Sequence, residues 1–124
     1  MRKTAHGSKK ILIVEDESDL CFLLELMLEK DHMSVDHVKS LAEARDYLKN
    51  ENPDLILLDN RLPDGLGVDF IPFLKTNYPG VRIVMISGKD HSAKDIALEN
   101  GADIFLPKPF TKNQLHQSVE SLLN

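Results

Sequence analysis

The chain has 124 residues, 42% of them hydrophobic and 28% charged, which is typical of one globular domain with its own core. Its net charge of −5 argues against direct nucleic-acid binding, which needs clustered Lys and Arg. The single cysteine excludes an internal disulfide, and no signal peptide or apolar run near the ~18 residues of a membrane span is found, so we expect a cytoplasmic protein that binds no membrane.

Five short apolar runs are predicted to be β-strands. The third has four apolar residues without a polar break and then stops at Asp59, which is typical of a strand buried on both faces of a parallel sheet. Pro63, Gly65 and Gly67 follow Asp59 as loop and turn residues. The predicted strands are Ile11–Val14, Ser34–Val38, Leu55–Leu58, Val81–Ile86 and Asp103–Leu106.

Helical patterns separate the first three strands. Ser40 and Glu43 form a capping box that opens a helix, with Leu41, Ala44 and Leu48 on its inner face. The range 18–30 predicts an earlier helix, because apolar residues recur on one face: Leu20, Leu23, Leu24, Met27 and Leu28.

Three further helices are expected in the second half of the chain. One should follow Gly67, with a kink or a late start because Pro72 would break its early hydrogen bonding. Another spans 90–100 and ends at Gly101, a natural helix stop. The last spans 111–123 and has one apolar face, made of Leu115, Val119, Leu122 and Leu123.

The alternation of strand and helix, five times along the chain, predicts one α/β domain with a doubly wound, five-stranded parallel sheet. Right-handed crossovers then place helices on both faces of that sheet. The basic stretch at residues 1–8 precedes the first strand, and we expect it to be a flexible amino-terminal tail to a domain covering residues 9–124.

Polar residues stand where four of the predicted strands end. Glu15 and Asp16 follow the first strand, Asp59 the third, Ser87 the fourth and Lys108 the fifth. Strand carboxyl ends meet at one edge of the sheet, where α/β proteins bind ligands. Three carboxylates gathered there repel one another unless one takes up a proton or a cation lies among them, and Mg²⁺ suits such hard oxygen ligands.

Each of these residues has a simpler explanation when it is taken alone. Asp59 could be a turn or N-cap aspartate, and Glu15 with Asp16 could cap the helix that follows them. Ser87 could belong to a turn, and Lys108 could be a solvated loop lysine. All four strand ends carrying such residues by chance is a much poorer explanation, so the combination favours a common site.

The sequence resembles the receiver domain of two-component response regulators over residues 9–124. This resemblance implies a flavodoxin-like fold with strand order 2-1-3-4-5 and five helices. It also implies a signalling switch that catalyses its own modification and slow self-dephosphorylation, rather than a turnover enzyme. The motifs that carry it are Glu15-Asp16, the run Pro53 to Asp59, Leu62-Pro63 with Gly67, Ser87-Gly88, Ala97 with Gly101-Ala102, and Lys108-Pro109-Phe110.

By this resemblance Asp59 would be the phosphoacceptor. Glu15, Asp16 and Asp59 would bind Mg²⁺ (or Mn²⁺) through their side chains, with the backbone carbonyl of Arg61 as a further ligand. Glu15 departs slightly from the family, in which aspartate is commoner at that position. These roles agree with the chemistry of phosphoryl transfer, which requires a protein mainly to position the reacting groups and to supply positive charge.

Ser87 and Lys108 would contact the phosphoryl oxygens, and Lys108-Pro109 would correspond to the family's cis peptide. Phe105 would be the switch aromatic, although it lacks the hydroxyl of the commoner tyrosine. A switch from mostly off to mostly on takes ~5.5 kcal/mol of differential interaction, and one charged hydrogen bond supplies about 1.5–3 kcal/mol. Both Ser87 and Lys108 would therefore be needed, and loss of either should leave partial activation.

Arg61 and Lys89 each lie two positions beyond a site residue. They are either solvated loop charges or groups that crowd the attacking water and alter the lifetime of the phosphoryl group. The five scattered histidines and Cys21 show no metal-ligand spacing, and we expect them to be core and surface residues.

The expected partners are a histidine kinase or histidine phosphotransfer protein, and a downstream protein or attached effector domain. Phe22 and Leu26 form a second apolar stripe on the first helix, which either rests on a neighbouring helix or docks a partner helix. Leu98 is expected to point outward and could mark an output face, although lone exposed leucines are common.

Three other functions are possible, and a feature of the sequence disfavours each of them. An aspartyl-phosphate hydrolase usually has a second aspartate two residues after the nucleophile, where this chain has Arg61. A pseudo-receiver used only as an interaction module would not need the intact set of site residues. A flavin-binding protein would need a phosphate-cradling loop after the first strand, where Glu15, Asp16 and Glu17 would repel phosphate.

Overall fold

The computed structural model describes residues 9–28, 33–88 and 93–123, so the expected tail at residues 1–8 lies outside it. Its main sheet has five parallel strands in the order β2-β1-β3-β6-β7. This is the predicted order 2-1-3-4-5, with the numbering displaced by two short additional strands. The main strands are β1 (Lys9–Val14), β2 (Met33–Val38), β3 (Leu55–Asp59), β6 (Arg82–Ser87) and β7 (Ile104–Pro107).

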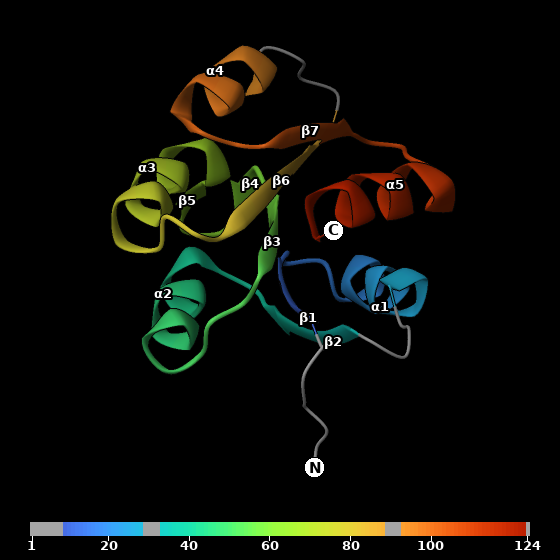
Figure 1. The fold of residues 1–124 in the computed structure, drawn as a ribbon, viewed down its shortest axis with the longest axis horizontal. Helices are drawn as coiled ribbons and strands as arrows, with labels where there is room; N and C mark the ends of the chain where they lie inside the picture. Colours follow the sequence, from blue (N-terminus) through green and yellow to red (C-terminus); the bar gives the residue numbers. More distant parts are fainter. Residues whose placement is uncertain (1–8, 29–32, 89–92, 124) are drawn as a thin grey trace.

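The strand β3 lies at the centre of the sheet and is buried along its whole length. Its alternate residues enter two separate cores: Ile56 and Leu58 pack on one face, and Leu55 and Leu57 on the other. Figure 1 shows α1 and α5 on one side of the sheet and α2, α3 and α4 on the other. The unbroken apolar run was therefore correctly interpreted as a strand buried on both faces.

The five predicted helices are all present, as α1 (Ser18–Leu28), α2 (Leu41–Asn50), α3 (Gly67–Asn77), α4 (Ala93–Asn100) and α5 (Lys112–Leu123). The first bond of the predicted capping box is formed, because the Glu43 N–H donates to Ser40 Oγ at 3.1 Å, whereas the Glu43 carboxylate accepts the N–H of Lys39, one residue before the cap, at 2.8 Å. The chain leaves α4 at Gly101 with a positive φ of 118°, as predicted for a helix stop.

The inner face of α1 differs from the prediction at one position. Cys21, Leu24 and Leu28 are buried, whereas Leu23 is 46% exposed. The spacing of Cys21, Leu24 and Leu28 follows one face of a helix, and Leu23 lies to the side of it. The expectation that Leu23 points inward is wrong, because the buried face of α1 is centred on Cys21, Leu24 and Leu28 and leaves Leu23 at its edge.

Of the two expectations for α3, a kink or a late start, the late start is wrong, because the helix begins at Gly67 and contains Pro72 in its second turn. Pro72 has no N–H to donate to the carbonyl of Val68 four residues earlier. The side chain of Asn100, at the end of α4, donates to that carbonyl at 2.9 Å instead.

A short antiparallel hairpin between β3 and α3 was not predicted. It consists of β4 (Arg61–Leu62) and β5 (Gly65–Leu66), in a segment expected to be a loop. The Asp64 carboxylate in its turn accepts the backbone N–H groups of Leu41 and Ala42, each at 2.9 Å, and so ties the hairpin to the start of α2. These bonds hold the pKa of Asp64 below its usual value.

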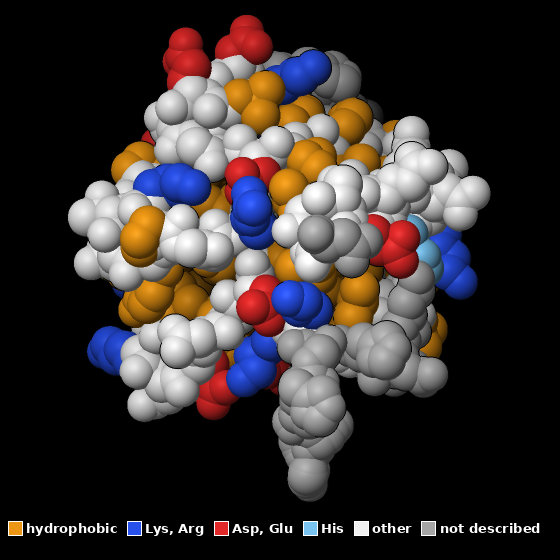
Figure 2. All heavy atoms as spheres, viewed as in Figure 1, with side chains coloured by type: hydrophobic (Ala, Val, Ile, Leu, Met, Phe, Trp, Pro, Cys, Tyr) orange, Lys and Arg blue, Asp and Glu red, His pale blue; other side chains and the backbone are white. Residues whose placement is uncertain are grey.

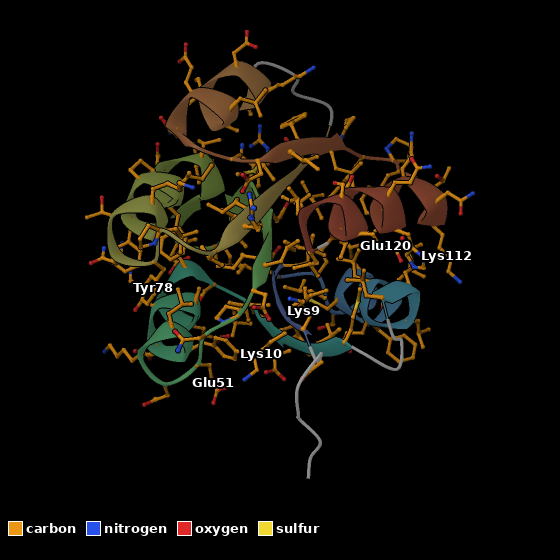
Figure 3. All side chains as sticks on the ribbon, viewed as in Figure 1. Lys9, Lys10, Glu51, Tyr78, Lys112 and Glu120 are labelled. Atoms are coloured by element: carbon orange, nitrogen blue, oxygen red, sulfur yellow. The ribbon has the colours of Figure 1, made fainter. Side chains whose placement is uncertain are left out.

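Charges are mixed at the edge of the sheet where β1 begins. Lys10 there forms an ion pair with Glu51, the residue after α2 (Figure 3). Over the described part of the face in Figure 2, basic and acidic side chains lie beside one another, with apolar side chains visible between them. Of the helices described, none has the length and apolar character needed to cross a membrane.

Candidate functional site

The carboxyl ends of β1, β3, β6 and β7 surround a cavity of about 530 Å³. Its position agrees with the rule that open α/β sheets bind ligands beyond the carboxyl ends of their strands. It contains most of the predicted site residues and three residues that were not predicted to belong to the site. Its lining is Asp16, Glu17, Asp59, Asn60, Arg61, Ser87, Gly88 and Lys108.

Three carboxylates gather at this edge, from Glu15, Asp16 and Asp59. One oxygen of each lies within 4.8 Å of the others. Glu15 and Asp59 are buried, at 2% and 7% exposure, whereas Asp16 is open to solvent. Hard oxygen ligands on one side and access to water on the other suit a small divalent cation such as Mg²⁺, which keeps part of its hydration shell. The donor set therefore fits the metal expected from the sequence.

Lys108 lies among these acids. Its Nζ is 3.3 Å from Asp59 Oδ1 and 3.5 Å from Glu15 Oε1. The Lys108 backbone N–H donates to the Ser87 carbonyl at 2.7 Å, which joins the ends of β7 and β6. The Lys108–Pro109 peptide is cis, as expected. Lysine is a compact point charge, so it neutralises part of the acidic cluster and leaves room for other groups.

The electrostatics of the site reflect buried acids that are only partly neutralised. Burial raises the pKa of Glu15 to about 7, and the carboxylates of Asp59 and Asp16 add to the increase. The hydrogen bond from the Glu17 N–H and the charge of Lys108 act in the opposite direction and lower this pKa. Burial likewise raises the pKa of Asp59, although Lys108 opposes the increase. Burial alone would lower the pKa of Lys108, but Asp59 and Glu15 raise it overall. The site thus retains a demand for positive charge.

Asn60, which was not predicted, fixes the position of Asp59. It is buried, its N–H donates to the Ile86 carbonyl at 3.1 Å, and its carbonyl accepts the Gly67 N–H at 2.8 Å. Its side-chain oxygen accepts the N–H of Val68 at 3.1 Å. No pattern in a single sequence distinguishes this asparagine from a turn residue, because its partners lie on other elements.

Gly67 allows the hairpin to close tightly on β3. A Cβ at this position would lie 2.3 Å from the backbone oxygen of Asp59, well inside van der Waals contact. Only glycine permits so close an approach of the two backbone segments. The glycine was noted in the sequence as part of a motif, but this role comes from a contact that only the structure shows.

The two remaining positions around Asp59 differ in how they lie. Arg61 has an exposed side chain and is paired with Leu66 across the hairpin. Arg61 also lines the cavity, and the role of its backbone carbonyl as a metal ligand stays a prediction. Lys89 lies outside the described residues.

Ser87 and Phe105 lie on neighbouring strands. Ser87 ends β6, is 3% exposed and lines the cavity. Phe105 is half-buried on β7, pairs with Met85 in the sheet and packs against the core under α2, α3 and α4. The structure therefore brings Ser87 to the acidic cluster and places Phe105 outside the lining of the cavity.

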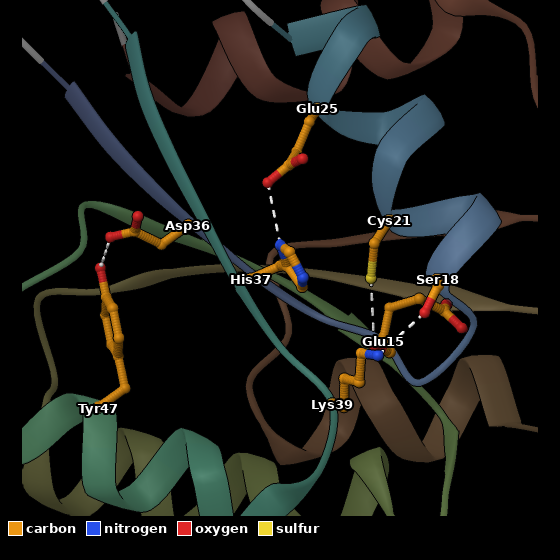
Figure 4. Close-up of polar contacts among 8 residues, drawn as sticks. All are labelled: Glu15, Ser18, Cys21, Glu25, Asp36, His37, Lys39 and Tyr47. Carbon is orange, nitrogen blue, oxygen red and sulfur yellow. Dashed lines mark hydrogen bonds and ion pairs between the residues drawn. The ribbon is translucent and has the colours of Figure 1, made fainter.

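Neighbouring contacts support the start of α1 at the rim of the site (Figure 4). The Cys21 thiol donates to the backbone oxygen of Glu15 at 3.2 Å, and the Lys39 ammonium donates to Ser18 Oγ at 2.9 Å. Burial and the nearby Glu15 raise the pKa of Cys21 to about 11. Cys21 is thus a buried core residue, as expected.

Comparisons with known proteins agree on the family. Residues 11–120 match the family described as the response regulator receiver domain. The response regulator protein PilR of Pseudomonas aeruginosa is 36% identical over 93% of this chain, which spans 26% of PilR. The KDP operon transcriptional regulatory protein KdpE of Escherichia coli is 39% identical over 91% of this chain, which spans 50% of KdpE. The chain thus spans half or less of these relatives.

Solved structures give the same result. A response regulator receiver domain protein (CheY-like) from Methanospirillum hungatei superposes with a TM-score of 0.86 at 27% identity, covering 93% of this chain and 94% of that one. The signal receiver domain of a signal transduction histidine kinase from Syntrophus aciditrophicus superposes with a TM-score of 0.84 at 30% identity, covering 94% and 90%. The chain belongs to the response regulator receiver family and is a phosphoacceptor signalling domain of a two-component system.

Proposed function

We propose that Asp59 accepts the phosphoryl group, within a receiver domain that covers residues 9–124. The observation that carries this proposal is the gathering of two further acids and one ammonium around the Asp59 carboxylate. A carboxylate oxygen of Asp59 forms a bond to phosphorus, and the donor's P–N or P–O bond breaks with its electron pair leaving on the donor. The product is an acyl phosphate.

The other site residues serve this transfer by holding charge and position. Glu15, Asp16, Asp59 and the Arg61 carbonyl would hold Mg²⁺ or Mn²⁺, which would supply positive charge to the phosphoryl oxygens when bound. The Lys108 ammonium, already 3.3 Å from Asp59, stabilises the added negative charge without a large movement.

Ser87 and Phe105 are proposed to act after the transfer. The Ser87 hydroxyl moves toward the new phosphoryl group and donates to it, and the Phe105 side chain on the neighbouring strand changes position in response. The support for this proposal is that Ser87 is buried at the cavity and that Phe105 lies half-buried on the neighbouring strand β7, opposite Met85. Arg61, with its exposed side chain beside the cavity, is proposed to affect the lifetime of the phosphoryl group, and we propose the same role for Lys89 from its place in the sequence.

The proposed phosphodonor is a histidine kinase or a histidine phosphotransfer protein, and the output is a downstream protein or an attached effector domain. Phe22 and Leu26 are 63% and 52% exposed, so of the two interpretations left open by the sequence we favour a docking stripe over a buried helix contact. We propose a cytoplasmic switch without substrate turnover. An aspartyl-phosphate hydrolase is disfavoured because Arg61, not an acid, stands two residues after Asp59.

Intact mass measured after incubation with Mg²⁺ and acetyl phosphate tests this proposal. The chain should gain one phosphoryl group, and Asp59→Asn should gain none. Asp54→Asn is the matched control, since Asp54 lies before the same strand but at its opposite end. A gain that survives in Asp59→Asn would overturn the assignment, and the absence of any gain would favour the pseudo-receiver.

A further inference from the structure

The peptide groups of Val68 are held by two side-chain amides from different parts of the chain. The Asn60 side-chain oxygen accepts the Val68 N–H at 3.1 Å, and the Asn100 side-chain nitrogen donates to the Val68 carbonyl at 2.9 Å. Val68 is buried in the first turn of α3. Its main chain therefore joins the residue after Asp59 to the last residue of α4.

The bond from Asn100 has a clear origin in the sequence. In an uninterrupted helix the carbonyl of Val68 would accept the N–H of residue 72, but Pro72 has none. A buried carbonyl without a donor is unfavourable, so the Asn100 amide replaces a bond that the helix cannot make by itself.

The end of α4 is well placed to supply this donor. The helices α3 and α4 lie side by side on one face of the sheet (Figure 1). A Cβ added to Gly101 would lie 2.9 Å from Lys75 Cγ, which shows how closely the end of α4 approaches α3. The N–H groups of Gly101 and Ala102 both donate to the Ala97 carbonyl, at 3.2 and 2.9 Å, and fix the turn after Asn100.

The other side of Val68 leads directly to the acceptor. Asn60 holds Val68, Gly67 and Ile86 with its side chain, carbonyl and N–H, so it responds to any tilt of the first turn of α3. Asp59 precedes it in the chain, and the Gly67 Cα lies against the Asp59 backbone oxygen without room for a Cβ. A displaced Val68 peptide would therefore move the Asp59 backbone.

We propose that Asn100 is a positioning residue for the phosphoacceptor site, acting through Val68 and Asn60 to hold Asp59. Asn100 lies outside the lining of the cavity, so this role is separate from any contact with the phosphoryl group or the metal. The inference rests on the proposed function for its rate measurement, but it also makes a prediction about the unmodified protein.

The experiment compares Asn100→Ala with the same change in a Pro72→Ala background. An alanine at position 72 restores the N–H that the Val68 carbonyl lacks, so Asn100 should become dispensable there. Asn77→Ala is the matched control, because Asn77 Nδ2 also donates to a carbonyl of α3, that of Phe73 at 2.9 Å, but at the exposed end of the helix. Asn100→Leu, similar in size and without a donor, replaces the alanine variant if that one does not fold.

Two readouts are measured: the maximal rate of phosphorylation by acetyl phosphate with saturating Mg²⁺, and the backbone amide signals of Asp59, Asn60 and Val68 in the unmodified protein. Asn100→Ala should lower the maximal rate about threefold to tenfold, leave the half-saturating phosphodonor concentration unchanged and shift these signals. In the Pro72→Ala background, Asn100→Ala should change the maximal rate by less than about twofold and should leave the amide signals almost unshifted.

Equal effects of Asn100→Ala in both backgrounds would overturn the proposal, as would an unchanged rate and unchanged amide signals. An effect of Asn77→Ala as large as that of Asn100→Ala would also overturn it. If the wild-type chain takes up no phosphoryl group, the proposed function fails, and the amide signals alone still decide whether Asn100 positions Asp59.

Discussion

The Lys108 ammonium lies 3.3 Å from Asp59 Oδ1, although 49 residues separate them in the chain. The pairing comes from topology, because β3 and β7 flank β6 in one parallel sheet and end at the same edge. Lys108 also reaches Glu15 on β1's side of the cavity, at 3.5 Å. The Lys108 ammonium thus contacts two acids of the cluster, Asp59 and Glu15, in the unphosphorylated protein.

Replacing Lys108 should therefore slow the transfer without unfolding the protein. We expect Lys108→Ala to lower the rate of phosphorylation by acetyl phosphate about tenfold to a hundredfold, because a positive charge aimed at the developing phosphoryl group is lost. Lys112→Ala, which removes an exposed lysine at the start of α5, is the control and should leave the rate unchanged. Equal rates for the two variants would show that Lys108 is not part of the transfer.

Gly67→Ala should damage both stability and phosphorylation. The added Cβ would lie 2.3 Å from the Asp59 backbone oxygen, so hairpin and strand must separate. We expect a loss of about 1–3 kcal/mol in the free energy of unfolding, measured by urea denaturation, and a lower phosphorylation rate. Gly80→Ala is the matched control, since its Cβ would meet nothing within 4 Å. A Gly67→Ala protein as stable and active as Gly80→Ala would show that the close approach is unimportant.

Binding of Mg²⁺ should become tighter as the pH rises from about 6 to about 8. The cause is Glu15, whose pKa burial raises to about 7, so that a proton competes with the metal below that value. In the metal-free protein a rise in pH has the opposite effect on stability. The folded protein binds the Glu15 proton more tightly than the unfolded chain does, so the free energy of unfolding falls as the pH rises through this range. Calorimetric titration measures the binding.

The control for this pH dependence is Glu15→Gln, which cannot titrate. Its Mg²⁺ affinity should be weaker and nearly independent of pH over the same range. A wild-type dissociation constant that does not change between about pH 6 and pH 8 would contradict the role of Glu15.

Phe22→Ala with Leu26→Ala should separate protein phosphodonors from small ones. Both side chains are exposed on α1, so their removal should weaken phosphotransfer from a histidine kinase or phosphotransfer protein about tenfold or more, while phosphorylation by acetyl phosphate is unchanged. Leu98→Ala on α4, whose side chain is 40% exposed, is the control. If the double variant accepts phosphate from the protein donor at the wild-type rate, the stripe has another role.

The parts of this structure that could be predicted are those with local signals. The apolar run before Asp59 indicated the central strand, and the Ser40–Glu43 pair indicated the start of α2. The convergence of Glu15, Asp59 and Lys108 could be predicted because all strands of a parallel sheet have their carboxyl ends at the same edge, and each of these residues follows or ends such a strand.

The parts that could not be predicted depend on contacts between distant segments. Asn100 and Val68 are 32 residues apart, and neither has a local pattern that indicates their hydrogen bond. Pro72 predicted a kink or a late start of the third helix because it lacks an N–H. Nothing near it in the sequence showed that Asn100 would donate to the Val68 carbonyl in its place. The inward placement of Leu23 is wrong because apolar residues surround most of α1, so their spacing alone does not show that the buried face is centred on Cys21, Leu24 and Leu28.

Locating the phosphoryl group on the chain tests directly whether Asp59 is the acceptor. Borohydride reduces an aspartyl phosphate to homoserine, which peptide mass spectrometry assigns to one residue. After incubation of the wild-type chain with Mg²⁺ and acetyl phosphate, we predict homoserine at Asp59 and at no other aspartate. Homoserine at Asp16 or elsewhere, with Asp59 unmodified, would contradict it.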